Sequence, residues 1–438
     1  MRKSYNLYSY PSAPRKKLIR RPHEAFFISS QKAYIIQTKA KMSRAKLALT
    51  WRIPGYYFAY FAALGIFLPF WPLYLKGEGF DPAVIGFLMG LFGLTKLAGP
   101  PLVGWLADHF GHPMRWVRLA SLLALLGFAL VFAVQGVWSM VWVMLLFTLA
   151  WNAAMPQFEA VTLHYLGTQP QRYSRVRVWG SVGFVVTAFG IGPLLDGWGA
   201  GVLPWAVLGM FSLMLLMALA VPDVKTLAMP AGAAGVHSGG RMQVWPILRR
   251  PEIYLFLAAS LLLQASHGTY YAFYSVYLEA HGHSNTLIGA LWALGVLAEV
   301  GIFMLVHRLL PRFGVLPLML AVMLLTSVRW VVIGSLPDSV LALLLAQLLH
   351  AFSFGVAHAV SVEFIRQHFT HGTQGRGQAL LSSIGYGAGG VLGFWLAGLS
   401  WQYAGALPSF LISAGMVLAA AVLIAWVMRR EAGSGQRI

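Results

Sequence analysis

The sequence predicts an all-α membrane protein in which twelve transmembrane helices form two parallel six-helix halves. Of its 438 residues, 58% are hydrophobic and 10% are charged, whereas a soluble domain has about 45–50% apolar and about 25% charged residues. A chain with so few charged residues cannot present a polar exterior to water. Soluble enzymes, nucleic-acid-binding proteins and disordered proteins are therefore not expected.

Apolar stretches long enough to span a membrane recur after residue 53. A helix needs about 20 mostly apolar residues to cross the hydrocarbon core, whereas barrel strands have about 10 residues of alternating polarity. Turn residues and charges separate the stretches, for example at Pro222-Asp223. The expected helices lie near residues 54–75, 82–107, 114–135, 138–165, 176–197, 200–221, 253–280, 285–309, 313–335, 338–367, 376–400 and 404–428.

The twelve stretches divide into two similar halves. The long connection between the sixth and the seventh is rich in Gly, Ala and Pro, and Leu106–Gly111 in the first half resembles Leu309–Gly314 in the second. Parallel halves with a site between them near the midplane are typical of alternating-access transporters. The expected domains are a basic leader at 1–53, a first bundle at 54–221, a cytoplasmic connection at 222–252, a second bundle at 253–428 and a cytoplasmic tail at 429–438.

The net charge of +19 has two sources. The leader holds 13 Lys and Arg residues and one acidic residue, Glu24, which accounts for +12. We expect this stretch to be disordered or wrongly assigned, with the natural chain beginning at Met42. The remaining excess lies in loops on one side of the spans, while the other side has Lys76 as its single Lys or Arg. Because Lys and Arg favour cytoplasmic loops, both termini are expected in the cytoplasm.

Ionisable residues within the spans are the first candidates for function, because they are costly in lipid and usually face a cavity or a partner. Glu159 and Arg177 lie 18 residues apart across a short inner turn, so two antiparallel helices can bring them together. An Arg fork matches a carboxylate or hydroxyl groups, so this pair, with Asn152 nearby, can bind a polar substrate. A structural ion pair between neighbouring helices is the alternative.

Further ionisable residues lie in the second half and in the second span. Glu299 and Arg329 can form a substrate-binding pair or a structural pair, and Glu299 can instead carry a proton. His350 is either a proton relay, since imidazole exchanges protons near neutral pH, or a packed core residue. Lys96 lies mid-span, from where its ammonium reaches the membrane surface only with difficulty, so we expect it to face a cavity.

The inner turn between the second and third spans has a distinctive spacing, Gly104-Trp-Leu-Ala-Asp108-His-Phe-Gly111-His-Pro-Met-Arg115. Glycine permits a tight turn, and Asp108 can cap helix N–H groups or contact the other half. We expect Gly104, Asp108, Gly111 and Arg115 to form a gating turn. The sequence has no phosphate-binding loop, metal-ligand cluster or nucleophilic triad, so we expect no catalytic residue, metal or cofactor.

These motifs resemble those of the major facilitator superfamily, whose signature turn is similar to the inner turn described above. The segments Asn152–Glu159 and Tyr173–Phe184 are similar to the lactose permease pattern, in which the corresponding Glu and second Arg bind sugar. The resemblance implies that Glu159 and Arg177 bind substrate, and that Phe184 takes the place of a stacking Trp.

Other segments resemble the phenylpropionic acid transporter group within this superfamily. They are Arg177-Val-Trp-Gly-Ser, His267–Tyr271, Ile288–Trp292, Leu349–Gly355 and Gly375–Gln378. The segment Gln347–Ser353 also resembles the proton-coupling segment of lactose permease, with His350 matching and Ser353 where that family has its proton-carrying Glu. The resemblance implies that Glu299 or Glu159 carries the proton, and it aligns Arg329 with a functional Arg.

Motifs and charges together predict a proton-coupled symporter that moves a small organic acid of the phenylpropionate type by alternating access. We expect it in a bacterial inner membrane, functioning as a monomer, with a small-molecule substrate, protons and the lipid bilayer as its partners and no nucleic acid. A sugar or nucleoside symporter and a drug efflux carrier are the alternatives. A non-transporting membrane sensor is the least favoured interpretation.

Overall fold

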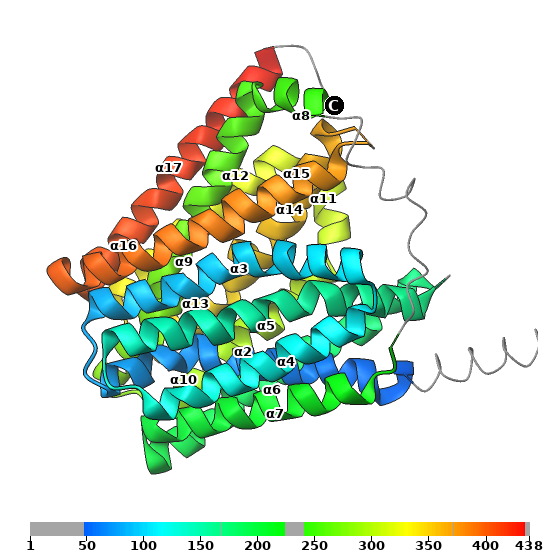
Figure 1. The fold of residues 1–438 in the computed structure, drawn as a ribbon. Helices are drawn as coiled ribbons and strands as arrows, with labels where there is room; N and C mark the ends of the chain where they lie inside the picture. Colours follow the sequence, from blue (N-terminus) through cyan, green and yellow to red (C-terminus); the bar gives the residue numbers. More distant parts are fainter. Residues whose placement is uncertain (1–47, 168, 224–240, 371, 434–438) are drawn as a thin grey trace, which may run out of the picture. The chain divides into compact units, whose positions relative to one another are not determined.

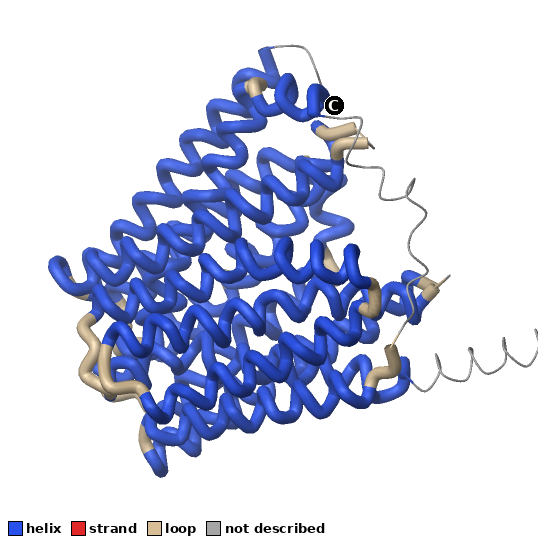
Figure 2. Tube along the Cα trace, viewed as in Figure 1, coloured by secondary structure: helices blue, strands red, loops and turns tan. Residues whose placement is uncertain are grey.

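The computed structural model describes residues 48–167, 169–223, 241–370 and 372–433. These residues are almost entirely helical and form no β-strand, with short loops between the helices (Figures 1 and 2). The all-α prediction is therefore confirmed. The predicted leader up to residue 47, including Met42, and the last residues of the tail lie outside the described residues, so the expectations for them remain predictions.

In the described chain before residue 223, six long helices lie close to the predicted positions. Pro occupies the first turn of α2, α3, α4 and α7, where its fixed φ and missing N–H are favourable. The helices are α2 (Ile53–Gly77), α3 (Pro82–Phe110), α4 (Pro113–Ala129), α5 (Val137–Leu166), α6 (Tyr173–Trp198) and α7 (Leu203–Ala220). The flanking short turns are η1 (Ala48–Arg52), η2 (Leu130–Ala133), η3 (Pro170–Arg172) and η4 (Ala200–Val202).

The second half follows the same pattern of long helices and tight turns. Two of its helices begin with serine caps, because the Ser284 hydroxyl accepts the Leu287 N–H at 3.2 Å and the Ser339 hydroxyl accepts the Ala342 N–H at 3.3 Å. The helices are α8 (Arg241–Leu248), α9 (Pro251–Ala280), α10 (Asn285–Phe303), α11 (Val306–Phe313), α12 (Val315–Ser335), α13 (Val340–Leu348), α14 (Ala357–His368), α15 (Gln374–Leu381), α16 (Gly389–Ala404) and α17 (Ala406–Gly433).

Three spans of the second half are less regular than predicted. The eighth span, expected at 285–309, ends at Phe303 and is followed by the separate short helix α11. The tenth and eleventh spans contain π-helical turns, namely η5 (Ala351–Val356) and η6 (Ser382–Ala388). Such turns often occur at functional sites. Hydropathy alone does not reveal them, because it reports the polarity of a segment and not its hydrogen-bond spacing.

Eleven helical segments in the described part of the chain are long and apolar enough to cross a membrane. The remaining predicted span is α9, which has 30 residues but carries Gln264, His267 and several tyrosines. Helix α9 packs against α16 and α17 and also contacts α2, so most of its polar side chains lie within the protein. A total of twelve spans is consistent with these helices.

Contacts within and between the halves follow a repeated pattern. In the first half α2 packs against α6 and α7, and α5 packs against α3 and α4; in the second, α9 packs against α16 and α17. The halves meet mainly through α6 with α10 and through α3 with α16 (Figure 1). The two similar sequence segments also end alike, because Gly111 and Gly314 both have positive φ, 66° and 79°, after a helix.

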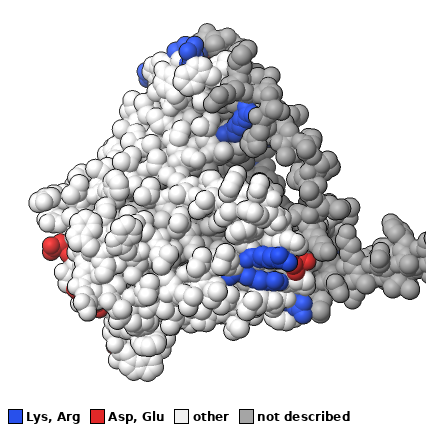
Figure 3. Space-filling model, in the orientation of Figure 1, with Lys and Arg blue, Asp and Glu red and all other residues white. Residues whose placement is uncertain are grey.

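Charged side chains are concentrated near the ends of the helices. In the view of Figure 3, basic side chains lie at the right and top, acidic side chains lie at the left edge and beside the basic cluster at the right, and a broad uncharged surface lies between the two ends. Large apolar side chains such as Trp138, Trp142 and Val422 are 77%, 70% and 68% exposed, respectively. Apolar exposure over such an area fits a lipid-facing surface.

Candidate functional site

At the outer end, a carboxylate of α6 in the first half caps the N-terminus of α10 in the second half. Asp196, near the end of α6, accepts the backbone N–H of Asn285 at 2.7 Å and that of Thr286 at 3.0 Å, together with the Thr286 hydroxyl at 2.6 Å. A carboxylate at a helix N-terminus is stabilised by the free N–H groups and by the helix dipole. Gly192 allows the close approach, since a Cβ there would lie 2.5 Å from the Asn285 carbonyl oxygen.

A similar contact joins α3 to α16 at the same end. The side-chain oxygen of Gln402 accepts the backbone N–H of Ala83 at 3.0 Å, which caps the start of α3 from the other half. Lys76, which lies at the end of α2 shortly before Ala83, forms an ion pair at 3.1 Å with Glu279 at the end of α9. A Cβ at Gly86 would lie 2.6 Å from the Cα of Gly398, so the helices touch there. The two halves are thus held together at their outer ends.

Three mid-span charges lie on the inner faces of their helices. Lys96, Arg177 and Glu299 are each accessible, yet each lies on the side of its helix opposite the lipid-facing residues. Positions two, five or nine residues apart project from roughly opposite sides of an α-helix. The exposed apolar residues at these spacings are Phe87 and Leu94 on α3, Val182 and Val186 on α6, and Leu297 on α10 with Met304 directly after its end. The three charges therefore face the space between the halves.

Arg177 and Glu159 do not form an ion pair with each other among the described side chains. The Arg177 guanidinium lies 4.0 Å from the ring centre of Phe61 and 5.8 Å from that of Tyr57. Glu159 instead accepts a hydrogen bond from the Tyr173 hydroxyl at 3.1 Å. Both side chains remain partly exposed, so Arg177 keeps N–H donors available for a ligand. The alternative of a structural ion pair is therefore not observed between these two side chains, because an aromatic ring and a tyrosine take the two contacts, and the substrate-binding role remains a prediction.

Glu299 faces His350 from the neighbouring span. The distance between Glu299 Oε2 and His350 Nε2 is 3.9 Å, and the carboxylate also interacts electrostatically with Arg177 across the space between the halves. A Cβ at Gly355 would lie 3.2 Å from Glu299 Cγ, so the π-helical turn brings α10 close to this span. Within the described residues, Nδ1 of His350 has no hydrogen-bond partner. The two side chains form a compact titratable pair.

Arg329 does not pair with Glu299, contrary to one expectation. Its side chain is fully buried, and its N–H groups are used within the second half. They donate to the Ala346 carbonyl oxygen at 3.0 Å, the Ser353 hydroxyl at 3.1 Å and the Gln347 side-chain oxygen at 3.2 Å. In this conformation Arg329 has no access to a ligand, so its predicted contact with substrate is not supported. It acts here as a link between α12 and the next span.

Asn152 and Phe184, also expected at the substrate site, are packed inside the first half. The Asn152 amide donates to the Phe92 carbonyl oxygen at 3.1 Å and to the Thr95 hydroxyl at 3.0 Å, which ties α5 to α3. Phe184 is 7% exposed, and its carbonyl oxygen would lie 2.5 Å from a Cβ at Gly65. Both side chains are buried in this conformation. The hydrogen bonds of Asn152 hold it within the first half, whereas Phe184 lies two helical turns after Arg177 and therefore on the same face of α6.

The predicted gating turn forms the expected tight turn between α3 and α4. Gly111 ends α3 in a left-handed conformation, and Gly104 lies earlier in the same helix, near Gln157 of α5. Arg115 Nε lies 3.6 Å from Asp223 Oδ2, so this basic residue contacts the end of its own half. The side chain of Asp108 lies outside the described residues. The gating role itself remains a prediction.

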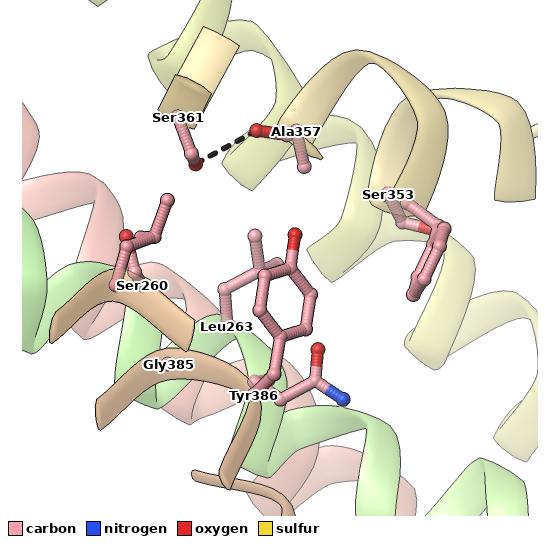
Figure 4. A pocket seen from close by; sticks show the side chains of 10 residues that line it. Ser260, Leu263, Ser353, Ala357, Ser361, Gly385 and Tyr386 are labelled. Carbon is pink, nitrogen blue, oxygen red and sulfur yellow. Dashed lines mark hydrogen bonds between the residues drawn. The ribbon is translucent and has the colours of Figure 1, made fainter. Parts of the chain in front are cut away.

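A small pocket lies within the second half (Figure 4). Its lining includes Ser260, Ser353, Ser361 and Tyr386, and its volume of about 20 Å³ matches roughly one water molecule. Tyr386 points into the pocket, and its hydroxyl lies 2.9 Å from His358 Nδ1. The pocket is too small for an aromatic acid, so the candidate substrate site is the space that the inner-face charges line.

Sequence reasoning missed the aromatic partners of the site. Phe61 and Tyr57 on α2 flank Arg177, and Tyr173 binds Glu159. One sequence signal was available for Tyr173, since it lies four residues before Arg177 and therefore on the same helix face. The contact with α2 had no such signal, because it depends on how two distant helices pack.

Comparison with known proteins agrees with this architecture. The model of the MFS_1 like family matches residues 50–412. The chain is 34% identical over 357 residues to "Probable 3-phenylpropionic acid transporter" from Escherichia coli (strain K12), which covers 80% of this chain and 90% of that protein. It is 28% identical over 352 residues to maltose permease from Geobacillus stearothermophilus, with 80% and 86% coverage.

Solved structures show the same fold at low sequence identity. A crystal structure of a mutant of the nucleoside transporter NupG matches with a TM-score of 0.79 at 16% identity, covering 86% of this chain and 99% of that chain. The POT family transporter PepTSo matches with a TM-score of 0.66 at 13% identity, covering 88% and 98%. The chain therefore belongs to the MFS_1-like family of the major facilitator superfamily and is a multi-pass membrane transporter rather than an enzyme.

Proposed function

We propose that this protein is a proton-coupled symporter that imports a small aromatic monocarboxylate, such as 3-phenylpropionate, across a bacterial inner membrane. The observation that carries the proposal is the placement of Arg177 among aromatic rings on one side of the space between the halves, with Glu299 on the other side. A relative at 34% identity is described as a probable 3-phenylpropionic acid transporter, which supports the same substrate class.

The substrate contact is proposed for the first half. A guanidinium binds a carboxylate through two parallel hydrogen bonds, and the flanking rings of Phe61 and Tyr57 offer apolar surface beside it. The Tyr173 hydroxyl donates a hydrogen bond to the Glu159 carboxylate. Glu159 therefore does not pair with Arg177, whose guanidinium remains available to the substrate. An aromatic acid presents one charged end and one apolar ring, which matches these neighbours better than a sugar with hydroxyl groups on all sides.

Proton coupling is proposed for the second half. Glu299 can be neutral or charged, and His350 at 3.9 Å can exchange a proton with it. Glu299 interacts electrostatically with Arg177, so a substrate carboxylate that binds Arg177 competes with Glu299 for the same positive charge. Substrate binding then favours uptake of a proton by Glu299, and the loaded carrier crosses with no added net charge.

Alternating access is proposed to proceed from the conformation described here. The outer ends are joined by Asp196 with α10 and by Gln402 with α3, so this conformation is closed on the outside. Opening outward requires these contacts to break while the inner ends approach. The distribution of Lys and Arg supports cytoplasmic termini, since basic residues concentrate in the loops on the opposite, inner side.

The proposal is tested by uptake into proteoliposomes with an imposed proton gradient, acidic outside. Labelled 3-phenylpropionate is expected to accumulate above its equilibrium level, and a protonophore is expected to abolish the accumulation. Glu299→Gln is expected to lose gradient-driven accumulation while retaining exchange of labelled for unlabelled substrate, because it binds substrate but cannot release a proton. Glu78→Gln, which changes an exposed carboxylate in an outer loop, is the matched control.

Two results would contradict the proposal. Wild-type protein that accumulates no aromatic acid under the gradient refutes the substrate class, and a parallel exchange panel of sugars and nucleosides then identifies which alternative holds. Gradient-driven accumulation by Glu299→Gln at the wild-type rate refutes the assignment of Glu299 as the proton carrier.

A further inference from the structure

Lys96 is a mid-span cation that neither the proton site nor the Arg177 site uses. It lies on α3 between two packed faces: Thr95 bonds to the Thr148 hydroxyl of α5 at 2.8 Å, and Leu97 packs against Gly387 of η6. The first of these neighbours belongs to the first half and the second belongs to the second half. Lys96 therefore lies on the face of α3 between the side that packs on the first half and the side that packs on the second half.

Burial along this face of α3 places Lys96 at the deepest accessible point. Toward the outer end, Met89 is fully buried and Phe92 is 7% exposed. Toward the inner end, Pro100 and Val103 are partly exposed, and Lys96 itself is exposed. The accessible space thus ends one helical turn beyond Lys96, where packed side chains close it. A substrate that enters this space reaches the ammonium at its closed end.

The charge of Lys96 is uncompensated within the described residues. Lys76 pairs with Glu279 at the outer end, whereas no described carboxylate lies within 4.0 Å of the Lys96 ammonium. An ammonium within the span is costly in lipid unless it meets water or a counter-charge. The mid-span charges of the described helices also leave one positive charge in excess: they are Lys96, Arg177, Arg329, Glu159 and Glu299.

We infer that Lys96 supplies a second positive charge to the substrate region, and that this charge favours compounds that carry a carboxylate on an apolar body over their neutral analogues. This inference rests on the proposed function. Arg329 cannot supply the charge, because its donors are bonded to protein within the second half. Arg177 lies against aromatic rings in the first half, so Lys96 is a separate positive charge that can add to the discrimination between an acid and its neutral analogue.

The experiment compares equilibrium binding of 3-phenylpropionate and its neutral amide, 3-phenylpropionamide, to purified protein in detergent. Wild type is expected to bind the acid more tightly than the amide. Lys96→Met is expected to lose about tenfold or more of its affinity for the acid, equivalent to about 1.4 kcal/mol, with little change for the amide. Lys96→Arg keeps the charge and is expected to retain most of the preference for the acid.

Stability in the absence of ligand separates this role from a structural one. Lys96→Met removes an unpaired charge from the span, so its Tm without ligand is expected to equal or exceed that of wild type, while the rise in Tm that the acid causes is lost. Arg429→Met, which neutralises an exposed cation at the inner end of α17, is the matched control and should retain both the affinity and the ligand-induced rise.

The outcomes distinguish this inference from the proposed function. Wild-type protein that neither binds nor transports any aromatic acid refutes the proposed function, and the inference falls with it. Wild-type protein that transports the acid, with Lys96→Met retaining the wild-type ratio of acid to amide affinity, refutes the inference alone. A fall in Tm without ligand, with unchanged selectivity, assigns Lys96 to folding and overturns its role in favouring the acid.

Discussion

The cap that Asp196 places on α10 gives a quantitative prediction about the outer closure. Asp196→Ala removes two backbone hydrogen bonds, at 2.7 and 3.0 Å, and one hydroxyl hydrogen bond, at 2.6 Å, between the halves. Loss of an N-cap side chain costs about 0.5–2 kcal/mol of stability. For a carboxylate this cost includes the lost interaction with the helix dipole. Because Asp196 accepts three hydrogen bonds, we expect a value in the upper part of this range, about 1–2 kcal/mol, which raises the ratio of outward-open to outward-closed protein by about 5–30-fold.

Distances between spin labels measure this shift. The sequence contains no cysteine, so cysteines introduced at Gly201 and Ser335, exposed residues near the outer ends of the two halves, are the only sites that label. Asp196→Ala is expected to increase the population with the longer distance. Asp196→Asn keeps one acceptor oxygen for a backbone N–H and is expected to give an intermediate population.

The same helix offers a matched control. Ser284→Ala also removes an N-cap from α10, but the Ser284 hydroxyl accepts the Leu287 N–H within the second half. This variant is expected to lower Tm without changing the distance distribution. A distribution for Asp196→Ala that matches wild type, or an equal shift in Ser284→Ala, would refute the reasoning that the cross-half cap holds the outer end closed.

Two further predictions test the packing between helices. Asn152→Ala removes hydrogen bonds to Phe92 and Thr95, so it should lower the free energy of unfolding by about 1–2 kcal/mol, measured by thermal denaturation. The KM for substrate should stay unchanged. A raised KM at unchanged Tm would instead assign Asn152 to the substrate site. Gly192→Val introduces a Cβ 2.5 Å from the Asn285 carbonyl oxygen, so the outer ends of the two halves should fail to close. The variant should still bind external substrate but should lose gradient-driven uptake. Uptake at the wild-type rate would contradict the steric argument.

The positions of the spans were predictable because each depends on a local property. Helix α6 begins at Tyr173 and ends at Trp198, within a few residues of the predicted 176–197, since the hydrocarbon core requires a fixed length of apolar chain. The break after Phe303 was not predictable in this way. The three residues directly after it, Met304, Leu305 and Val306, are apolar, so hydropathy does not mark where the helix ends.

The candidate site was predictable in its charged residues and not in its partners. Glu159, Arg177 and Glu299 stood out because ionisable groups are rare within spans. Glu159 and Arg177 were predicted to bind substrate together, with an ion pair between them as the alternative. That ion pair is absent from the described structure, and the aromatic ring of Phe61 lies beside the guanidinium instead. Sequence spacing limits which residues can meet, but the packing of α2 against α6 determines which of them do.

The sequence by itself determined the twelve spans, their division into two halves and the few charges that lie inside the membrane, because the length and polarity of each segment set its position in a bilayer. The tertiary structure decided which of those charges are available to a ligand. Arg177 faces the space between the halves, whereas Arg329, equally polar, is bonded within the second half. The rotation of a helix about its axis depends on its neighbours, so only the packed structure separates a binding residue from a structural one.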